Sequence, residues 1–389
     1  MGTESRDPRK MGNWMAGKIL YCASTVSHLM NFHLPYLRAF HEMGFEIWAA
    51  ADRETPVPYA DHVVALPLRK KITSPENIRA IFAARKLLKE QKFDLVSTHT
   101  MLASVIVRAA ALLLLKRPKI FCTVHGYLFH ETDGLSKWVY LLPEKLCARV
   151  TDVLMVMNRE DYEIAQRHKL YRNQLISIAG MGIDLTKFQP ITEEERSSAR
   201  EELGLGNDAV VFVYAAEFSR RKNQALLIRS FAEISRGRTD LTLLLAGTGA
   251  LLEECKALAH SLGAEDRIRF PGYVTNMRQL YSACDACVST SRIEGLPFNI
   301  MEAMACGLPI IASDIKGHRE LLEGETGLLF HDGEELKAQL QRLAQDASLR
   351  ASLRSRGLRA VERYGLSEVF PTVMKCYEPL LPGSGDYNK

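Results

Sequence analysis

Short apolar runs, rich in β-branched and aromatic residues, alternate with longer helix-like segments along most of the chain. In the first half the strand-like runs are 18–22, 46–50, 62–66, 94–98, 119–124, 153–157 and 175–178. The helix-like segments between them are 34–43, 76–91, 102–115 and 137–150. Because parallel strands are joined by crossover connections that usually contain a helix, this alternation predicts a parallel sheet covered by helices on both faces.

The same alternation starts again in the second half of the chain. Strand-like runs occur at 210–215, 241–246, 268–270, 286–290 and 309–312. Helix-like segments occur at 224–235, 250–262, 277–283 and 297–306. The sequence therefore predicts the α/β class, with two doubly wound, Rossmann-like domains. Ligands are expected in a cleft between them, at the carboxyl ends of the strands.

A polar, charged stretch at 189–208 separates the two halves. A chain of 389 residues is too long for one ordinary hydrophobic core, and domain boundaries fall in stretches of this kind. We therefore expect a flexible leader over 1–16, an N-terminal domain over 17–187, a C-terminal domain over 188–366, and a C-terminal helix and tail over 367–389.

The composition narrows the class of protein. With 47% hydrophobic and 25% charged residues, the chain is expected to be globular rather than disordered. The net charge of +4 gives no indication of nucleic acid as a partner, and it fits a protein that binds diphosphates or an anionic membrane. The eight cysteines have no framework spacing, which suits a reducing cytoplasm. The longest apolar stretch, 101–115, carries Arg108, so a buried or interfacial helix fits it better than a membrane span.

The segment 291–307 is the most informative part of the sequence. It follows a strand-like run, and Pro297 stands where proline favours the first turn of a helix. The backbone amides from Leu296 to Phe298 would carry partial positive charge at that helix start, which makes them a candidate cradle for phosphate. Gly295, just before them, allows a ligand to approach the backbone closely.

Two carboxylates lie in the same segment. Glu294 is in the loop before the expected helix, and Glu302 is inside it, on the same face as Asn299 one turn earlier. At this spacing the two carboxylates can accept hydrogen bonds from hydroxyl groups on different parts of one ligand. A solvated loop glutamate beside an ordinary amphipathic helix would give the same pattern.

Two other loops in the second half follow a strand-like run and precede a helix. In the first loop, Arg221 and Lys222 are placed to contact a diphosphate, although such a run of cations also fits a solvated turn. In the second loop, Gly247 and Gly249 allow a base or a sugar to approach the backbone, although a tight turn is the ordinary explanation.

In combination these features resemble the retaining glycosyltransferases of family 4, which have the fold known as GT-B. The resemblance extends from about residue 18 to the C-terminal helix, and its most specific motif is the pair of Glu294 and Glu302 around Glu-Gly-Leu-Pro-Phe-Asn. Lys222, in Lys-Asn-Gln, matches the segment whose lysine binds the donor diphosphate. His125, in Thr-Val-His-Gly, matches the histidine near the donor sugar.

This chain departs from the family pattern in two places. Many relatives have a glycine-rich loop after the first strand, where this chain has Ala-Ser-Thr-Val-Ser. The acceptor or phosphate contacts would then fall to Ser24, Thr25 or His33. Many relatives also carry an arginine five positions before the lysine, where this chain has Glu217.

The resemblance implies transfer of a hexose or N-acetylhexosamine from a UDP-sugar to a lipid-linked or saccharide acceptor in surface polysaccharide synthesis. In this role Lys222 stabilises the leaving diphosphate, Glu294 holds the sugar, and Glu302 holds the ribose. The implied donor site also contains Tyr273, and Arg221 is expected to assist Lys222. The UDP-sugar is a co-substrate; no cofactor is expected, and no divalent metal, because the chain has no evident Asp-x-Asp pair.

The resemblance also implies where the protein works and how its chain ends. The expected location is the cytoplasm, with peripheral contact at the inner face of the membrane through basic clusters at 69–71, 85–89 and 116–119. The C-terminal helix is expected to pack back on the N-terminal domain. Two other functions remain open on the sequence: a nucleotide-sugar epimerase of the same fold, and a nucleotide-sugar-binding protein without catalytic activity.

Overall fold

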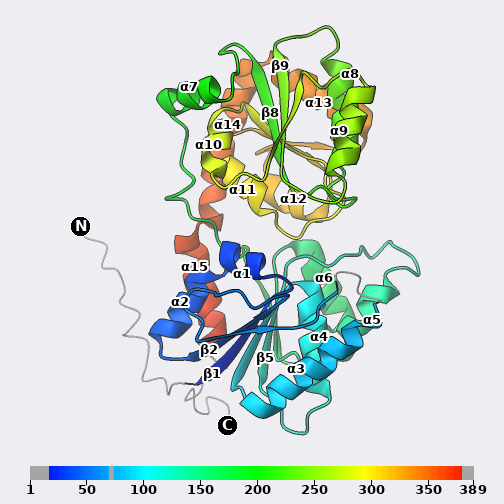
Figure 1. Cartoon of the computed structure of the whole chain (residues 1–389), viewed down its shortest axis with the longest axis vertical. Helices are drawn as coiled ribbons and strands as arrows, with labels where there is room; N and C mark the ends of the chain where they lie inside the picture. The colour runs from blue at the N-terminus through cyan, green and yellow to red at the C-terminus, as the bar shows by residue number, and fades with distance from the viewer. Residues whose placement is uncertain (1–16, 70–73, 379–389) are drawn as a thin grey trace, which may run out of the picture. The chain divides into compact units, whose positions relative to one another are not determined.

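The computed structural model describes residues 17–69 and 74–378, and its chain divides into two α/β units (Figure 1). Among the described residues, unit 1 comprises 17–69, 74–182 and 367–378, and unit 2 comprises 183–366. The chain thus passes into the second unit at 182/183, whereas the sequence suggests 187/188. The expected leader over 1–16 lies outside the described residues.

Unit 1 contains a parallel sheet of seven strands in the order β3-β2-β1-β4-β5-β6-β7 (Figure 1). The strands are β1 (Lys18–Cys22), β2 (Glu46–Ala51), β3 (His62–Ala65), β4 (Leu95–His99), β5 (Lys119–Val124), β6 (Val153–Val156) and β7 (Gln174–Ser177). The α-helices are α1 (Val26–Phe32), α2 (Leu34–Glu42), α3 (Asn77–Gln91), α4 (Met101–Leu112), α5 (Trp138–Cys147), α6 (Arg159–His168) and, at the end of the chain, α15 (Leu366–Tyr377).

Unit 2 contains a parallel sheet of six strands in the order β10-β9-β8-β11-β12-β13. The strands are β8 (Val210–Ala215), β9 (Leu241–Ala246), β10 (Ile268–Gly272), β11 (Ala286–Ser289), β12 (Ile310–Ser313) and β13 (Leu328–Phe330). The α-helices are α7 (Glu193–Glu202), α8 (Gln224–Ile234), α9 (Leu252–Ser261), α10 (Met277–Ser282), α11 (Phe298–Ala305), α12 (Lys316–Leu322), α13 (Gly333–Gln345) and α14 (Ala347–Val361).

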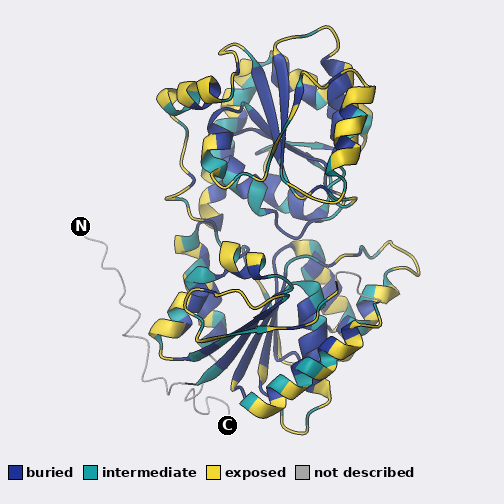
Figure 2. Ribbon diagram, viewed as in Figure 1, coloured by how far each residue is buried: buried dark blue, intermediate teal, exposed yellow. Residues whose placement is uncertain are grey.

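Both sheets have the strand order of a doubly wound nucleotide-binding fold. Counted within its unit, the second sheet runs 3-2-1-4-5-6, and the first has the same order with a seventh strand added. The central strands lie buried between layers of helices whose outer faces are exposed (Figure 2), whereas the edge strands β3 and β7 are partly exposed. All six residues of β9 are buried, as expected for a strand covered on both faces. The predicted doubly wound α/β class is confirmed in both units.

The polar stretch between the two halves is an ordered part of unit 2. Thr192 caps α7 and forms a capping box with Glu195, which explains why so charged a segment is helical. From α7, Arg196 and Arg200 donate hydrogen bonds to the two carboxylate oxygens of Asp285, at 2.6 and 2.7 Å. Asp285 immediately precedes β11, so α7 is fixed to the amino end of a central strand.

The end of the chain returns to unit 1. The ring of Tyr377, in α15, stacks on Phe121 of β5 with a centroid separation of 4.0 Å, and its hydroxyl lies 2.7 Å from Ser97 Oγ in β4. Tyr377 and Ser97 are fully buried. The predicted packing of the C-terminal helix on the N-terminal domain is therefore confirmed.

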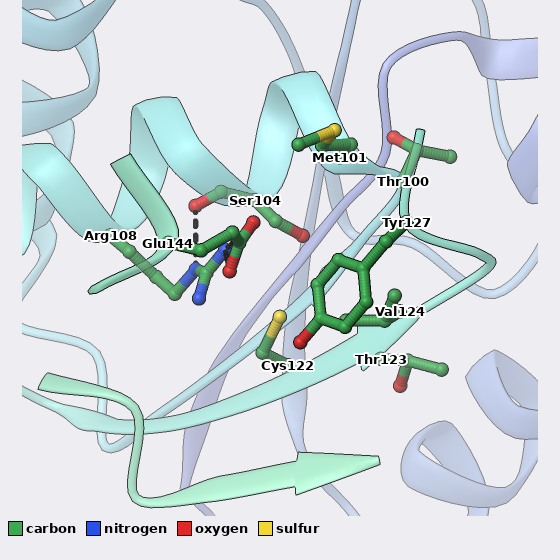
Figure 3. Close-up of a pocket in the computed structure, with 9 residues that line it drawn as sticks. All are labelled: Thr100, Met101, Ser104, Arg108, Cys122, Thr123, Val124, Tyr127 and Glu144. Atoms are coloured by element: carbon green, nitrogen blue, oxygen red, sulfur yellow. Dashed lines mark hydrogen bonds and ion pairs between the residues drawn. The ribbon is translucent and has the colours of Figure 1, made fainter. Parts of the chain in front are cut away.

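Arg108 shows how α4 can be apolar and still carry a charge. Its guanidinium is fully buried and donates to both carboxylate oxygens of Glu144 in α5, at 2.9 Å each. This ion pair borders a cavity of about 10 Å³, lined also by Ser104, Thr123 and Tyr127 (Figure 3). Such a space holds about one water molecule, so the cavity is too small for a sugar or a nucleotide.

Candidate functional site

Three charged side chains meet at the carboxyl edge of the unit 2 sheet. Lys222 and Arg221 lie in the loop after β8, and Glu294 lies in the loop after β11. Because β8 and β11 are paired parallel neighbours, both loops leave the sheet at the same edge, where the strand order reverses. Lys222 Nζ donates to one carboxylate oxygen of Glu294, and Arg221 Nη1 donates to the other at 3.1 Å.

The charges in this cluster are unequal. Glu294 is only 9% exposed, and burial alone would raise the pKa of its carboxyl group. The cations of Lys222 and Arg221 outweigh that effect and lower the pKa to about 2, so the carboxylate is ionised at neutral pH. Two cations against one carboxylate leave a net positive charge, which suits an anionic ligand.

Hydrogen bonds to backbone carbonyls hold the two loops together. The hydroxyl groups of Tyr214 and Thr290 each donate to the carbonyl oxygen of Lys222, at 3.1 Å. The Tyr214 hydroxyl also lies 2.7 Å from Ser291 Oγ. Asn299 Nδ2 donates to the carbonyl oxygen at the end of β8 at 3.0 Å. The backbone of Lys222 is therefore held from β8 and from the loop after β11, and α11 is joined to the end of β8.

Helix α11 starts one residue later than the sequence indicates. Pro297 is the N-cap, with an extended backbone, rather than part of the first turn. Gly295, Leu296 and Pro297 are buried, whereas Phe298 and Asn299 are partly exposed. The segment predicted to hold phosphate thus lies beside Glu294, and its backbone is packed into the unit.

Glu302 lies inside α11 and differs electrostatically from Glu294. Burial raises the pKa of Glu302 to about 7, although Lys187 and a hydrogen bond from Tyr281 act in the opposite direction. Near neutral pH this carboxyl group is therefore divided between its protonated and ionised forms. The two glutamates of the motif are not equivalent: Glu294 is a permanent anion held by cations, and Glu302 is a titrating group.

Gly247 and Gly249 are required by the fold of unit 2 itself. Both have positive φ angles, 136° and 154°. A Cβ atom at Gly247 would lie 2.1 Å from the carbonyl oxygen of Ala216, and one at Gly249 would lie 2.4 Å from that of Phe218. The loop after β8 therefore lies close to both glycines, and the approach of a base or a sugar stays a prediction.

Tyr273 follows β10 and is 70% exposed. In the described part of the chain, no hydrogen bond or ring contact joins it to Lys222, Glu294 or Glu302. The structure therefore does not bring Tyr273 together with the charged cluster.

In unit 1 the loop after β1 has well-defined internal contacts. Ser24 Oγ lies 2.6 Å from Thr100 Oγ1, which follows the neighbouring strand β4. Thr25 is the N-cap of α1, and its hydroxyl oxygen accepts a hydrogen bond from the backbone N–H of His28 at 3.2 Å. Both side chains that the sequence offers as ligand contacts have structural roles at the carboxyl edge of this sheet.

His125, just after β5, belongs to a cluster of four histidines. The ring of His28 in α1 lies 4.6 Å from that of His125, and the ring of His33 lies 4.1 Å from that of His99, measured between centroids. Burial lowers the pKa of His28 to about 4 and lowers the pKa values of the other three well below the usual range. The four rings are therefore neutral at neutral pH.

A chain of polar contacts leads from His125 to the C-terminal helix. His125 Nε2 lies 3.4 Å from His99 Nδ1, and His99 Nε2 lies 2.9 Å from Ser97 Oγ. Ser97 in turn contacts the hydroxyl of Tyr377. Sequence reasoning missed His28 and His99. His99 could have been predicted from its position, because it ends β4 at the same edge of the sheet as His125.

Two family models match the chain in these two units. The model described as "Glycosyl transferase 4-like domain" matches residues 34–179, and "Glycosyl transferases group 1" matches residues 195–359. The chain is 34% identical over 323 residues to "Putative glycosyltransferase EpsD" of Bacillus subtilis (strain 168), covering 82% of this chain and 85% of that protein. It is 29% identical over 263 residues to "UDP-Gal:alpha-D-GlcNAc-diphosphoundecaprenol alpha-1,3-galactosyltransferase" of Escherichia coli, covering 66% and 67%.

Solved structures share the fold of the chain. A sucrose-phosphate synthase from Thermosynechococcus elongatus has a TM-score of 0.77 at 21% identity, covering 94% of this chain and 99% of that one. HepE from Anabaena, solved in complex with UDP and glucose, has a TM-score of 0.75 at 20% identity, covering 92% and 99%. Within residues 17–69 and 74–378, none of the helices has the length and apolar character needed to cross a membrane.

Proposed function

The chain belongs to the glycosyltransferase family whose group 1 and 4-like models match its two halves. We propose that it moves a sugar from a UDP-sugar to a lipid-linked or saccharide acceptor, with retention of configuration. The observation that carries the proposal is the cluster of Lys222, Arg221 and Glu294 at the point where the strand order of unit 2 reverses. HepE, which was solved with UDP and glucose, supports UDP as the nucleotide. The name of the Escherichia coli relative, a transferase acting on a diphosphoundecaprenol, supports a lipid-linked acceptor.

The proposed reaction depends on charge placed where the leaving group forms. When the bond between the sugar C1 and the diphosphate oxygen breaks, negative charge grows on the diphosphate, and Lys222 with Arg221 stabilises it. The acceptor hydroxyl oxygen bonds to C1 on the same face, and its proton passes to a donor phosphate oxygen. Glu294, as an anion, accepts hydrogen bonds from the sugar, Glu302 from the ribose, and His125 contacts the donor sugar.

A donor panel tests the proposed function. The purified chain is incubated with UDP-hexoses, UDP-N-acetylhexosamines and lipid-diphosphate or saccharide acceptors, and products are identified by intact mass. Sugar transfer to an acceptor supports the proposal. An altered donor formed without acceptor would identify an epimerase, and binding without any product would identify a non-catalytic protein.

The two glutamates are expected to separate in a nucleotide titration. Glu302→Ala should weaken binding of UDP alone by about ten- to one-hundredfold, as expected for loss of hydrogen bonds to a carboxylate at about 1.5–3 kcal/mol. Glu294→Ala should leave UDP affinity nearly unchanged and reduce sugar transfer, because its proposed partner is the sugar. Calorimetric titration of UDP into both variants measures this, and the reverse pattern would contradict the two assignments.

Sugar transfer is expected to continue in excess chelator. The reason is that Lys222 and Arg221 supply the positive charge that a divalent ion supplies in many other nucleotide-sugar enzymes. The measurement is the initial rate with and without the chelator at saturating donor. A rate that vanishes in chelator and returns with magnesium or manganese would show that these cations are insufficient.

Peripheral membrane contact is supported by one face of unit 1. Helix α5 exposes Trp138, Val139, Leu142 and Leu146 by 43–53% each, and Lys145 Nζ lies 5.8 Å from the ring centroid of Trp138. Apolar and aromatic residues beside a cation are typical of helices that lie in a membrane interface.

The basic clusters support this membrane contact less fully than the sequence suggests. Arg117 is bonded to both oxygens of Asp152, at 2.6 and 2.8 Å, and residues 70–71 lie outside the described chain. The proposed contact therefore depends on α5 with its own cation Lys145, and Lys116 and Lys119 are the cations left in the third cluster.

Binding to anionic liposomes is expected to need the α5 face. Trp138→Ser combined with Leu142→Ser should weaken co-sedimentation at least tenfold, because full burial of such a side chain is worth about 1.5–3 kcal/mol and about half of each is exposed for insertion. Leu262→Ser, which alters an exposed leucine of unit 2, is the control. Equal binding by the double variant and the control, or no binding at low salt by the unaltered chain, would count against membrane contact.

A further inference from the structure

Three of the clustered histidines have the arrangement of a metal site. One ring nitrogen each of His28, His33 and His125 lies within 4.8 Å of the others. The three come from separate places in unit 1: α1, the junction of α1 with α2, and the loop after β5. Ligand nitrogens of a tetrahedral zinc ion lie roughly 3.3 Å apart, given bonds of about 2.0–2.1 Å. Small rotations of the rings would therefore close the set around one ion.

Two of these histidines each have a buried ring nitrogen without a hydrogen-bond partner among the described residues. His28 Nε2 and His33 Nε2 are buried, and neither has a hydrogen-bond partner among the described residues. Buried polar atoms in folded proteins are nearly always paired, so two unpaired acceptors side by side indicate a missing ligand. A bound cation would satisfy both atoms together.

Two of the three rings have outer contacts of the kind that orient metal-binding histidines. His33 Nδ1 lies 2.9 Å from the hydroxyl oxygen of Tyr21, which can accept a hydrogen bond from Nδ1–H. In that tautomer Nε2 carries the lone pair that binds a metal ion. His125 is contacted through His99, whose ring is held by Ser97. These outer contacts limit the rings of His33 and His125 to small rotations about their present orientations.

We propose that unit 1 binds one transition-metal ion of the zinc class through His28, His33 and His125, with a water molecule as the fourth ligand. Three imidazoles and no carboxylate select zinc, cobalt, nickel or copper over magnesium, calcium or manganese, which prefer oxygen ligands. This site is separate from the diphosphate contacts in unit 2, for which no divalent ion is expected.

Metal binding has a consequence that rests on the proposed function. If His125 contacts the donor sugar, an ion bound to its ring competes with that contact, and the zinc-loaded chain is inactive. The binding itself does not depend on this role. It is therefore tested by direct measurement of the ion, and a failure of the proposed glycosyl transfer would leave that measurement unaffected.

The experiment uses the full chain without a histidine tag, stripped with chelator and titrated with Co²⁺. One equivalent of Co²⁺ should bind with the intense visible absorption of a tetrahedral site, and Zn²⁺ should remove the colour. His28→Ala should weaken Co²⁺ binding at least tenfold, whereas His41→Ala, which removes an exposed histidine of the same unit, should not.

Two results would overturn the proposal. One is the absence of stoichiometric Co²⁺ absorption in the unaltered chain. The other is undiminished absorption in His28→Ala. Circular dichroism and a melting curve verify that His28→Ala is folded; if it is not, His125→Asn takes its place and the same tenfold loss is expected.

Discussion

Replacing Lys222 by alanine is expected to lower the rate of sugar transfer by about 100- to 1,000-fold, the loss of about 3–4 kcal/mol that follows removal of one group stabilising a transition-state charge. Lys222 Nζ donates a hydrogen bond to Glu294, and the backbone carbonyl of Lys222 accepts hydrogen bonds from Tyr214 and Thr290. The ammonium group is thus positioned before the donor binds. A preorganised charge of this kind acts most strongly on the leaving diphosphate, so turnover should fall more than donor binding.

Arg229→Ala is the matched control, because Arg229 is an exposed cation of α8, seven positions along the chain. A double-mutant cycle separates the two tasks of Lys222. If Lys222 only pairs with Glu294, Lys222→Ala/Glu294→Gln should be no slower than Glu294→Gln alone. If it contacts the diphosphate, the double variant should be slower by at least tenfold. Equal rates for Lys222→Ala and Arg229→Ala would remove Lys222 from the site.

The alternation of apolar runs was enough to predict most of the fold. Eleven strands, including β8 and β9, occur within one residue of the expected bounds at both ends, because buried parallel strands are nearly continuous apolar runs. The sequence reading missed β13 (Leu328–Phe330), which has only three residues and no apolar period of its own. It also treated 189–208 as a polar interruption after the domain junction, where the capping box of Thr192 and Glu195 starts α7.

The residues of the charged cluster were predictable, but their pairing was not. Lys222 and Glu294 are 72 residues apart, and they meet because β8 lies beside β11 and not beside β10. Strand order is a property of the folded sheet and leaves no local mark in the sequence. The same holds for Arg108, whose charge is compatible with the core only because Glu144 reaches it from another helix.

The histidine cluster is a second set of contacts that could not be predicted from the local sequence. A single histidine such as His28 carries no sign of its neighbours, and only the folded unit brings four rings together from α1, β4 and the loop after β5. Neutral rings in a buried cluster also depend on the surrounding core, which lowers the pKa of His28 to about 4. The resemblance identified His125, and the structure shows that His28, His33 and His99 lie beside it.

Glu302 is expected to make the stability of unit 2 depend on pH in a direction opposite to that of most carboxyl groups. Burial raises its pKa from 4.5 to about 7, so the folded state holds a proton that the unfolded chain has released. The resulting stabilisation is fully present below pH 4.5 and is lost as the pH rises through about 7. Between pH 5 and pH 8 the loss should be about 2 kcal/mol, since each pKa unit corresponds to about 1.4 kcal/mol and the group is partly exposed.

Glu302→Gln isolates this contribution, because the amide keeps the shape of the side chain and does not titrate. The comparison is needed because His318, also in unit 2, has its pKa lowered to about 4 by burial and acts with the opposite sign. Hydrogen exchange of the unit 2 strands at pH 5 and pH 8, corrected for the intrinsic exchange rate, gives the free energy of opening. The unaltered chain should lose about 2 kcal/mol more over this range than Glu302→Gln. The same change in the free energy of opening in both proteins would contradict this prediction. It would mean that Glu302 is already ionised at pH 5, and that a partner within the protein holds its carboxylate and makes it unavailable to the proposed ribose.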